Sequence, residues 1–169
     1  MDSQATIDEL ITMAISAELA ARDLYLQLEK MFAPHKDVAL FWKHYADEEA
    51  GHARWLEQLR QRLSAEQLAA PADSTALENA RKALAIPVET LLAQIDNLED
   101  AYQLVNELEG SETNAVFDFL IGEFSEDEKT LAFLRTQLRE HVGRLMIDLP
   151  ARFKGVGLRL QTRAVRPDR

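Results

Sequence analysis

The 169-residue sequence contains no cysteine. This absence excludes disulfide bonds, thiolate nucleophiles, and iron or zinc sites that are held by thiolates. A metal ion in this protein would therefore be bound through oxygen and imidazole nitrogen. Those ligands suit iron, manganese or zinc.

Long apolar runs are also missing, because none approaches the roughly 18 residues that a membrane-spanning helix requires. The N-terminus, Met-Asp-Ser-Gln, lacks the basic start of a secretory signal. We therefore expect a cytoplasmic protein without a membrane partner. The length of the chain predicts one domain with a substantial core.

Basic residues are in the minority, and the formal net charge is −10. Binding to phosphates needs a basic surface, so we expect no nucleic-acid partner. The charge is uneven, because residues 148–169 hold six Lys or Arg against two Asp, a net of +4 that leaves −14 for the remainder. We interpret residues 148–169 as a basic C-terminal tail that follows a domain over residues 1–147. Such a tail lies on the acidic body, on a neighbouring subunit or on an acidic partner.

Strand-like alternation is not seen, whereas apolar residues recur every three or four positions along four long segments, which is the period of an α-helix. The predicted long helices span about 6–32, 37–69, 88–109 and 112–141, and a short helix spans about 74–84. Tight joints link the first helix to the second and the third to the fourth, and a long crossover separates the pairs. This order predicts an all-α, antiparallel four-helix bundle with one crossover connection.

Charged residues stand on the apolar faces of these predicted helices. Glu49 and His52 are three positions apart, so both face one side of the second helix. Glu18 falls on the apolar face of the first helix, and Glu128 on that of the fourth. Unpaired carboxylates are costly to bury, so such groups bind a cation, take protons or avoid burial. We therefore predict a metal site between the helices that is built from Glu18, Glu49, His52 and Glu128.

This pattern resembles the ferritin-like superfamily, most closely its rubrerythrin type, over roughly residues 6–142. In that superfamily two helices each supply a Glu and the other two each supply Glu-x-x-His. The resemblance implies that Glu18 and Glu128 are ligands from the first and fourth helices. It also implies that Glu49 bridges two ions and that His52 is a terminal ligand.

A weak internal duplication relates the two helical hairpins. It pairs the segment around Tyr25 with that around Tyr102 (102 − 25 = 77) and the second helix with the fourth at a similar offset. It then places Ile95 where the third helix should offer its Glu, and Leu131 where the fourth should offer its His. In the family such a tyrosine lies near the metals, so the resemblance implies that role for Tyr25 and Tyr102. The alternative is that both are simple core aromatics.

Two ligands are therefore expected to be missing. A one-residue rotation of the third helix would bring Asp96 and Glu99 toward the site, and these two are the alternative ligands. Without them, three Glu and one His serve one divalent ion well and two ions poorly. In a metal-free protein, Arg22 or Arg135 would supply the missing positive charge.

Three functions stay open from the sequence, and none of them assigns a catalytic residue. The resemblance implies a homodimeric rubrerythrin-like protein with one or two iron ions, zinc and manganese being the alternatives. It would reduce peroxide or oxygen with electrons from an external donor, because the cysteine-bound iron centre of that family is absent here. The second hypothesis is a non-catalytic metal-binding, sensing or scaffold protein with a degenerate site. The third is iron storage in a bacterioferritin-like cage.

Overall fold

The computed structural model describes residues 4–110 and 112–153. Within those residues the chain forms eight helices and one isolated β-bridge, between Thr6 and Pro71. The helices are α1 (Ile7–Met31), α2 (Lys36–Arg62), α3 (Ala65–Ala69), α4 (Ser74–Ala83), α5 (Val88–Leu92), α6 (Leu98–Glu109), α7 (Glu112–Phe124) and α8 (Glu128–Phe153).

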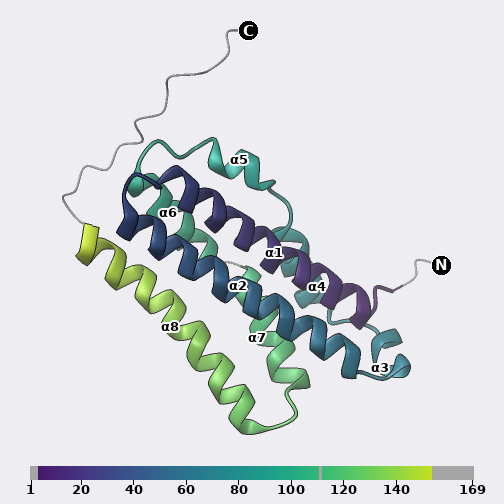
Figure 1. The fold of residues 1–169 in the computed structure, drawn as a ribbon. Coiled ribbons are helices and arrows are strands. Elements are labelled where there is room, and N and C mark those ends of the chain that lie inside the picture. Colours follow the sequence, from purple (N-terminus) through teal and green to yellow (C-terminus); the bar gives the residue numbers. More distant parts are fainter. Residues whose placement is uncertain (1–3, 111, 154–169) are drawn as a thin grey trace, which may run out of the picture.

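The long helices form a bundle with one crossover (Figure 1). Helices α1 and α2 lie side by side and antiparallel, joined by a short turn. Helices α6 and α7 follow one another in the general direction of α2 and together occupy the third position of the bundle. Helix α8 runs back in the direction of α1, and α3, α4 and α5 make the connection between the two halves. This arrangement confirms the predicted all-α bundle.

Side-chain caps explain where several helices begin. At the start of α1, Thr6 Oγ1 accepts a hydrogen bond from the Glu9 backbone N–H at 3.3 Å, and the Glu9 carboxylate accepts one from the Thr6 N–H at 2.7 Å. This reciprocal capping box satisfies two N–H groups that lack partners within the helix. At the start of α6, the Asn97 side chain accepts a hydrogen bond from the Asp100 N–H at 2.9 Å.

The first half of the chain follows the prediction closely. Helix α1 and the short helix α4 lie where the sequence placed them. The predicted second helix, to about residue 69, is too long, because α2 ends at Arg62. Ser64 then forms a new capping box with Gln67 and begins the separate helix α3.

The second half differs more. The predicted helix 88–109 is divided into α5 and α6, because Asn97 caps a new start. The predicted helix 112–141 is divided at residues 125–127, where the Asp127 side chain accepts a hydrogen bond from the Thr130 N–H at 2.8 Å and begins α8. The tight turn between the last two positions of the bundle is therefore at residues 125–127 and not at Gly110.

The predicted tail overlaps the last helix. Helix α8 continues to Phe153, so the boundary that the sequence analysis placed at residue 148 falls inside a helix. The remaining residues of that tail, 154–169, lie outside the described residues.

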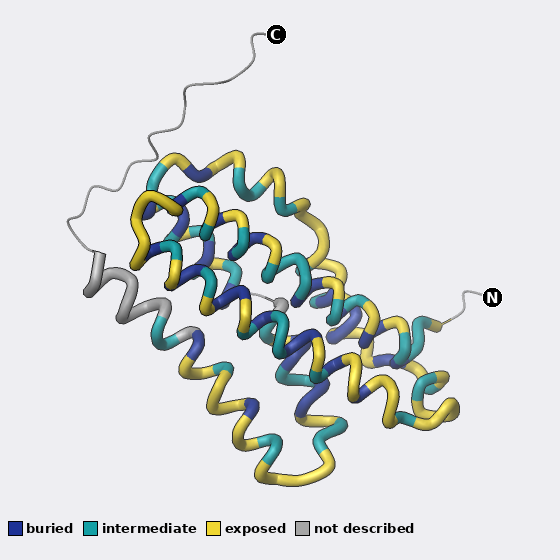
Figure 2. Tube along the Cα trace, in the orientation of Figure 1, coloured by how far each residue is buried: buried dark blue, intermediate teal, exposed yellow. Residues whose placement is uncertain are grey.

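The long helices carry buried positions along their length (Figure 2). The buried apolar side chains form two clusters, one toward each end of the bundle. The first apolar cluster includes Leu28 on α1, Trp42 on α2 and Ala101 on α6. The second apolar cluster includes Leu10 on α1 and Phe117 on α7. Between the two clusters, at mid-height of the bundle, buried polar residues replace apolar ones.

None of the described helices is both long enough and apolar enough to cross a membrane.

Candidate metal centre

Five buried ionisable residues lie between the two apolar clusters, and we call them the carboxylate–histidine layer. Each position of the bundle contributes to it. The layer consists of Glu18 on α1, Glu49 and His52 on α2, Glu109 on α6 and His141 on α8. Their exposed fractions are 1%, 2%, 5%, 7% and 1% in that order, so bulk water hardly reaches them.

The first group of ligand atoms joins α1 to α2. Nδ1 of His52 lies 3.2 Å from Glu49 Oε2 and 3.4 Å from Glu18 Oε2. Glu49 and His52 meet because a spacing of three residues puts both side chains on one face of α2. Within the described residues, Glu18 Oε2 is a buried oxygen with no hydrogen-bond partner of acceptable geometry. An oxygen in that state is suited to accept a proton or a cation.

The second group joins α2 to α6 and α8. Nε2 of His141 lies 2.9 Å from Glu109 Oε1 and 3.1 Å from Glu49 Oε1. Glu49 therefore belongs to both groups and faces each with a different oxygen. Within each group the ligand atoms all lie within 4.8 Å of one another. Two sets of oxygen and nitrogen donors that share one carboxylate are the arrangement expected for two neighbouring metal ions.

Glu109 is held in place by neighbouring hydrogen-bond donors. The buried hydroxyl of Tyr25 donates to Glu109 Oε1. The side-chain amide of Asn114 donates to Glu109 Oε2 at 3.0 Å and to the Glu109 carbonyl at 2.6 Å. Both carboxylate oxygens of Glu109 are thus engaged, in contrast to Glu18.

His141 is held by residues of α2 and of its own helix. Nδ1 of His141 contacts Glu48, on the side of the ring opposite to Glu49 and Glu109. The guanidinium of Arg144 donates to the same Glu48 carboxylate, and the hydroxyl of Tyr45 donates to the His141 carbonyl at 2.8 Å. An ionised carboxylate accepts hydrogen bonds but cannot donate them. Both ring nitrogens of His141 face carboxylates, so both carry a proton, and His141 is a charged imidazolium in the metal-free protein.

The electrostatics of the first group follow from its geometry. Burial opposes the charge on His52, but its contacts with Glu18 and Glu49 outweigh burial and raise the pKa of His52 to about 10. Burial and the neighbouring Glu49 carboxylate raise the pKa of Glu18 well above its usual range. Burial also opposes ionisation of Glu49, but His141 and His52 hold the pKa of Glu49 well below its usual range. In the metal-free protein, these neighbours therefore favour the charged form of Glu49 and the protonated form of Glu18.

In the second group, burial and charged neighbours again have opposite effects on the pKa values of His141 and Glu48. Burial lowers the pKa of His141, but Glu109 and Glu48 reverse this effect and raise the pKa well above its usual range. Half-burial opposes charge on Glu48, but His141 and Arg144 lower the pKa of Glu48 to about 2. Burial, followed by the charge of Glu109, raises the pKa of the Tyr25 hydroxyl well above its usual range.

The structure brings together three of the four predicted ligands and places the fourth elsewhere. Glu18, Glu49 and His52 form the first group. Glu128 is the first residue of α8, is exposed to solvent and belongs to neither group. The prediction that it lies beside the others is wrong, because the turn at residues 125–127 puts it at the end of the bundle.

The alternative ligands also lie outside the layer. Asp96 and Glu99 are exposed at the start of α6, far along the helix from Glu109. Of the two tyrosines, Tyr25 contacts Glu109, as the prediction of a role beside the ligands requires. Tyr102 is half-buried and packs against the first apolar cluster.

Glu109 and His141 were missed by the sequence analysis, although a signal for both exists. On the third predicted helix the apolar positions Tyr102 and Val105 lead, after four more residues, to Glu109. On the fourth, Leu138 leads to His141 after three. Glu109 falls at the end of the predicted third helix, beside Gly110, and His141 at the end of the predicted fourth, where a histidine also suits the helix C-terminus as a charge.

The register of the internal duplication changes accordingly. The structure matches Glu18 with Glu109 (109 − 18 = 91) and His52 with His141 (141 − 52 = 89), in place of an offset near 77. The residue equivalent to Glu49 is then Leu138 (138 − 49 = 89). A carboxylate from the third helix and an imidazole from the fourth are present after all. The departure from the superfamily pattern is a single leucine in the second Glu-x-x-His.

The two positions that lack an expected ligand, and the two arginines considered as replacement charges, have structural roles outside the layer. Ile95 is buried in the first apolar cluster, and Leu131 packs against the second. Arg22 pairs with Asp23, and the guanidinium of Arg135 lies 3.0 Å from Asp118. The positive charges inside the bundle are therefore imidazoliums rather than these arginines.

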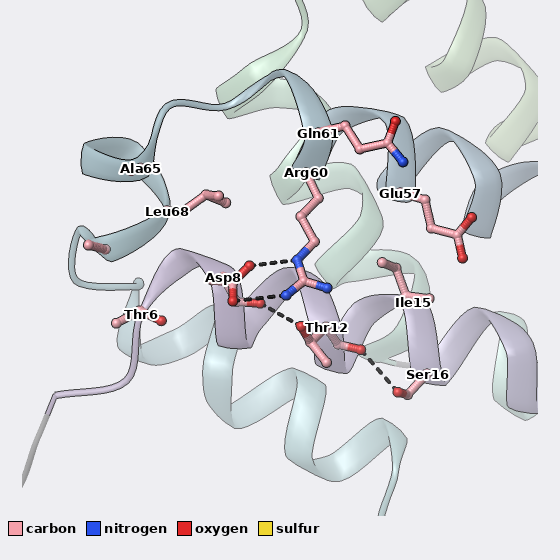
Figure 3. Close-up of a pocket in the computed structure, with 11 residues that line it drawn as sticks. Thr6, Asp8, Thr12, Ile15, Ser16, Glu57, Arg60, Gln61, Ala65 and Leu68 are labelled. Atoms are coloured by element: carbon pink, nitrogen blue, oxygen red, sulfur yellow. Dashed lines mark hydrogen bonds and ion pairs between the residues drawn. The ribbon is translucent and has the colours of Figure 1, made fainter.

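A separate hollow of about 870 Å³ lies between α1, the end of α2 and α3 (Figure 3). The charged groups that line it include Asp8 and Arg60, which form a two-point ion pair at 2.6 and 3.0 Å. Its lining includes no member of the carboxylate–histidine layer. The hollow is therefore separate from the carboxylate–histidine layer.

Comparisons with known proteins agree with this geometry. A family model described as Rubrerythrin matches residues 9–130. The matched range includes Glu18, Glu49, His52 and Glu109 and ends before His141. Neither the curated proteins nor the solved structures contain a significant match.

Proposed function

Because the chain belongs to the rubrerythrin family, we propose that its carboxylate–histidine layer binds two iron ions and reduces peroxide with electrons from an external donor. The observation that carries this proposal is the position of Glu49, which faces both groups of ligand atoms. One shared carboxylate allows two cations to sit close together without a second full set of ligands.

The residues of the layer fit the proposed ions. The donors are carboxylate oxygen and imidazole nitrogen, which suit iron and also manganese or zinc. Glu18 Oε2 is buried and has no hydrogen-bond partner among the residues that the structure describes, so a bound cation would satisfy it. Glu18, Glu49 and His52 would hold one ion, and Glu49, Glu109 and His141 the other.

When bound, iron supplies reversible one-electron chemistry, so that H₂O₂ takes up two electrons and two protons and yields two H₂O. The chain itself positions the side chains of the layer and isolates them from bulk water. The two apolar clusters above and below the layer exclude bulk water, which strengthens every electrostatic interaction inside it. The hydroxyl of Tyr25 keeps its proton at Glu109, since the pKa of Tyr25 is raised well above its usual range. The electrons must come from outside, because the chain has no cysteine to hold an iron–thiolate centre.

A second function is favoured by Leu138. With a leucine in place of a second shared carboxylate, Glu49 alone among the described residues joins the two groups. A protein that holds one ion and does not turn over would be a metal-binding or sensing module. Leu138 lies three residues before His141, on the same side of the layer, so the retained ion would be bound by Glu18, Glu49 and His52.

Metal content of protein from iron-supplemented cells, purified without chelators, tests both functions. We expect two iron atoms per chain and an absorbance change on adding peroxide. One atom per chain with no response to peroxide would support the second function, and none would exclude both. Glu49→Ala should lose metal, whereas Glu57→Ala, an exposed glutamate on the same helix, should retain it.

A further inference from the structure

A narrow pocket leads from the surface of the crossover to the carboxylate–histidine layer. It lies between α1 and the α4–α5 segment, and we call it the apolar pocket. At its outer end is Ile86, which is 54% exposed. At its inner end are the buried side chains of Tyr25, Glu49 and Glu109.

The walls of the apolar pocket are hydrophobic and close together. Its lining includes Ala20 and Ala21 on α1 and Val88 and Leu91 on the crossover. The space for molecules of the size of water is about 40 Å³, enough for about three of them at roughly 10–15 Å³ each. Short alanine side chains keep the passage open, since a longer side chain at either position would fill it.

A second approach to the layer has a different character. A groove of about 460 Å³ lies between α2 and α8, and we call it the polar groove. It reaches His52, and its lining includes Asp47, Glu48 and Arg54. The polar groove is wider and is lined by charged side chains, whereas the apolar pocket is narrow and has mostly apolar walls.

We propose that the apolar pocket is the entry passage for the oxidant and that Ala20 and Ala21 set the upper size limit of the molecules that enter. This inference rests on the proposed function, and it names the substrate class as uncharged molecules of two or three heavy atoms, such as hydrogen peroxide or dioxygen. Organic hydroperoxides with a bulky substituent are excluded by the walls. The inner end of the pocket directs an entering molecule to Glu49 and Glu109, the side of the layer braced by Tyr25.

The passage can be tested without any metal. In the metal-free, full-length protein under xenon pressure, the methyl resonances of Val88 and Leu91 should shift and saturate, because apolar cavities of this kind take up xenon. The methyl resonances of Leu10, buried in the second apolar cluster, should not. Ala21→Leu should abolish the shifts, and Ala20→Leu serves as a second variant if the first does not fold.

Ala39→Leu is the matched control, because Ala39 is a half-buried helical alanine that does not line the pocket. It should leave the xenon-induced shifts unchanged. Wild-type protein without saturable shifts at Val88 and Leu91 would overturn the proposal. So would shifts that survive in both Ala20→Leu and Ala21→Leu.

Kinetics of the iron-loaded protein separate this inference from the proposed function. Hydrogen peroxide should oxidise the reduced iron at least about tenfold faster than cumene hydroperoxide, and Ala21→Leu should slow hydrogen peroxide by a similar factor without changing iron content. Equal rates for both peroxides would overturn the passage and leave the iron site intact. Saturable xenon binding together with iron that reacts with no peroxide would instead contradict the proposed function and leave the proposed passage supported.

Discussion

Glu49 Oε1 lies 3.1 Å from His141 Nε2, although the two residues belong to opposite halves of the chain. The other oxygen of Glu49 faces His52 at 3.2 Å. One carboxylate on α2 thus ties both hairpins of the bundle together at mid-height.

Leu138→Glu should strengthen binding of a second metal ion. Position 138 is three residues before His141 and faces the same side of α8, so the new carboxylate would complete a second Glu-x-x-His. Without metal, the buried carboxylate should lower the free energy of unfolding by about 1–3 kcal/mol. Isothermal titration with manganese(II) should show a second site that binds about tenfold more tightly than in the wild type.

Leu131→Glu is the matched control, since Leu131 lies two turns earlier on the same face of α8 and packs against the second apolar cluster. It should lose stability without any gain in metal binding. An equal gain in both variants would mean that added negative charge, and not the completed ligand set, strengthens the site.

Glu48→Gln should weaken metal binding by about 10- to 100-fold, because a carboxylate that contacts the far nitrogen of a ligating histidine fixes the ring and increases its basicity. Glu48 contacts His141 Nδ1, and Arg144 neutralises the pair from outside. The control is Asp47→Asn, which removes an exposed carboxylate at the position before Glu48. Asp47 pairs with Lys43. That control should bind metal as the wild type does, and similar losses in the two variants would refute a specific role for Glu48.

Metal affinity should rise with pH between 6 and 8. His52, with its pKa raised to about 10, holds its proton at neutral pH in the metal-free protein, and the raised pKa of Glu18 favours its protonated form. A metal ion must displace these protons, so affinity should increase about tenfold per pH unit for each proton released. Calorimetry in buffers of different ionisation enthalpy counts the protons, and a count of zero would contradict the described contacts.

The metal-free protein should lose stability as the solution becomes alkaline. The pKa of His52 is raised from 6.5 to about 10 on folding, so its stabilising contribution is complete below pH 6.5 and is lost as pH rises toward 10. Urea unfolding at pH 6.5, 8 and 9.5 should show this decline. His52→Gln should flatten it, whereas His44→Gln, at an exposed position, should leave the decline unchanged.

Tyr25→Phe should lower the free energy of unfolding by about 2 kcal/mol, because it removes a buried hydrogen bond to the Glu109 carboxylate and keeps the ring. Tyr102→Phe makes the same chemical change at a half-buried position that packs against the first apolar cluster. Its effect should stay within about 0.5 kcal/mol. Equal losses in the two variants, measured by urea unfolding, would show that the hydroxyl of Tyr25 has no special role.

Much of the fold could be predicted from local patterns. The period of three to four residues located α1, α2 and α4, since amphipathic helices and their caps depend on residues a few positions apart. The spacing of Glu49 and His52 and the position of Glu18 on an apolar face predicted, for the same reason, that these three side chains lie close together inside the bundle, as they do. The position of the turn that separates α7 from α8 was not predicted, because Gly110 marks a helix end as strongly as residues 125–127 do.

The sequence by itself determined that this protein is helical, free of thiolate chemistry and equipped with a Glu-x-x-His on a buried face. Only the tertiary structure decided that Glu109 and His141 complete the layer, that Glu128 lies outside it and that Leu138 takes the place of a second shared carboxylate. The reason is physical. Helix period and capping act over a few residues, whereas the height at which distant helices meet depends on how their side chains pack across the whole bundle.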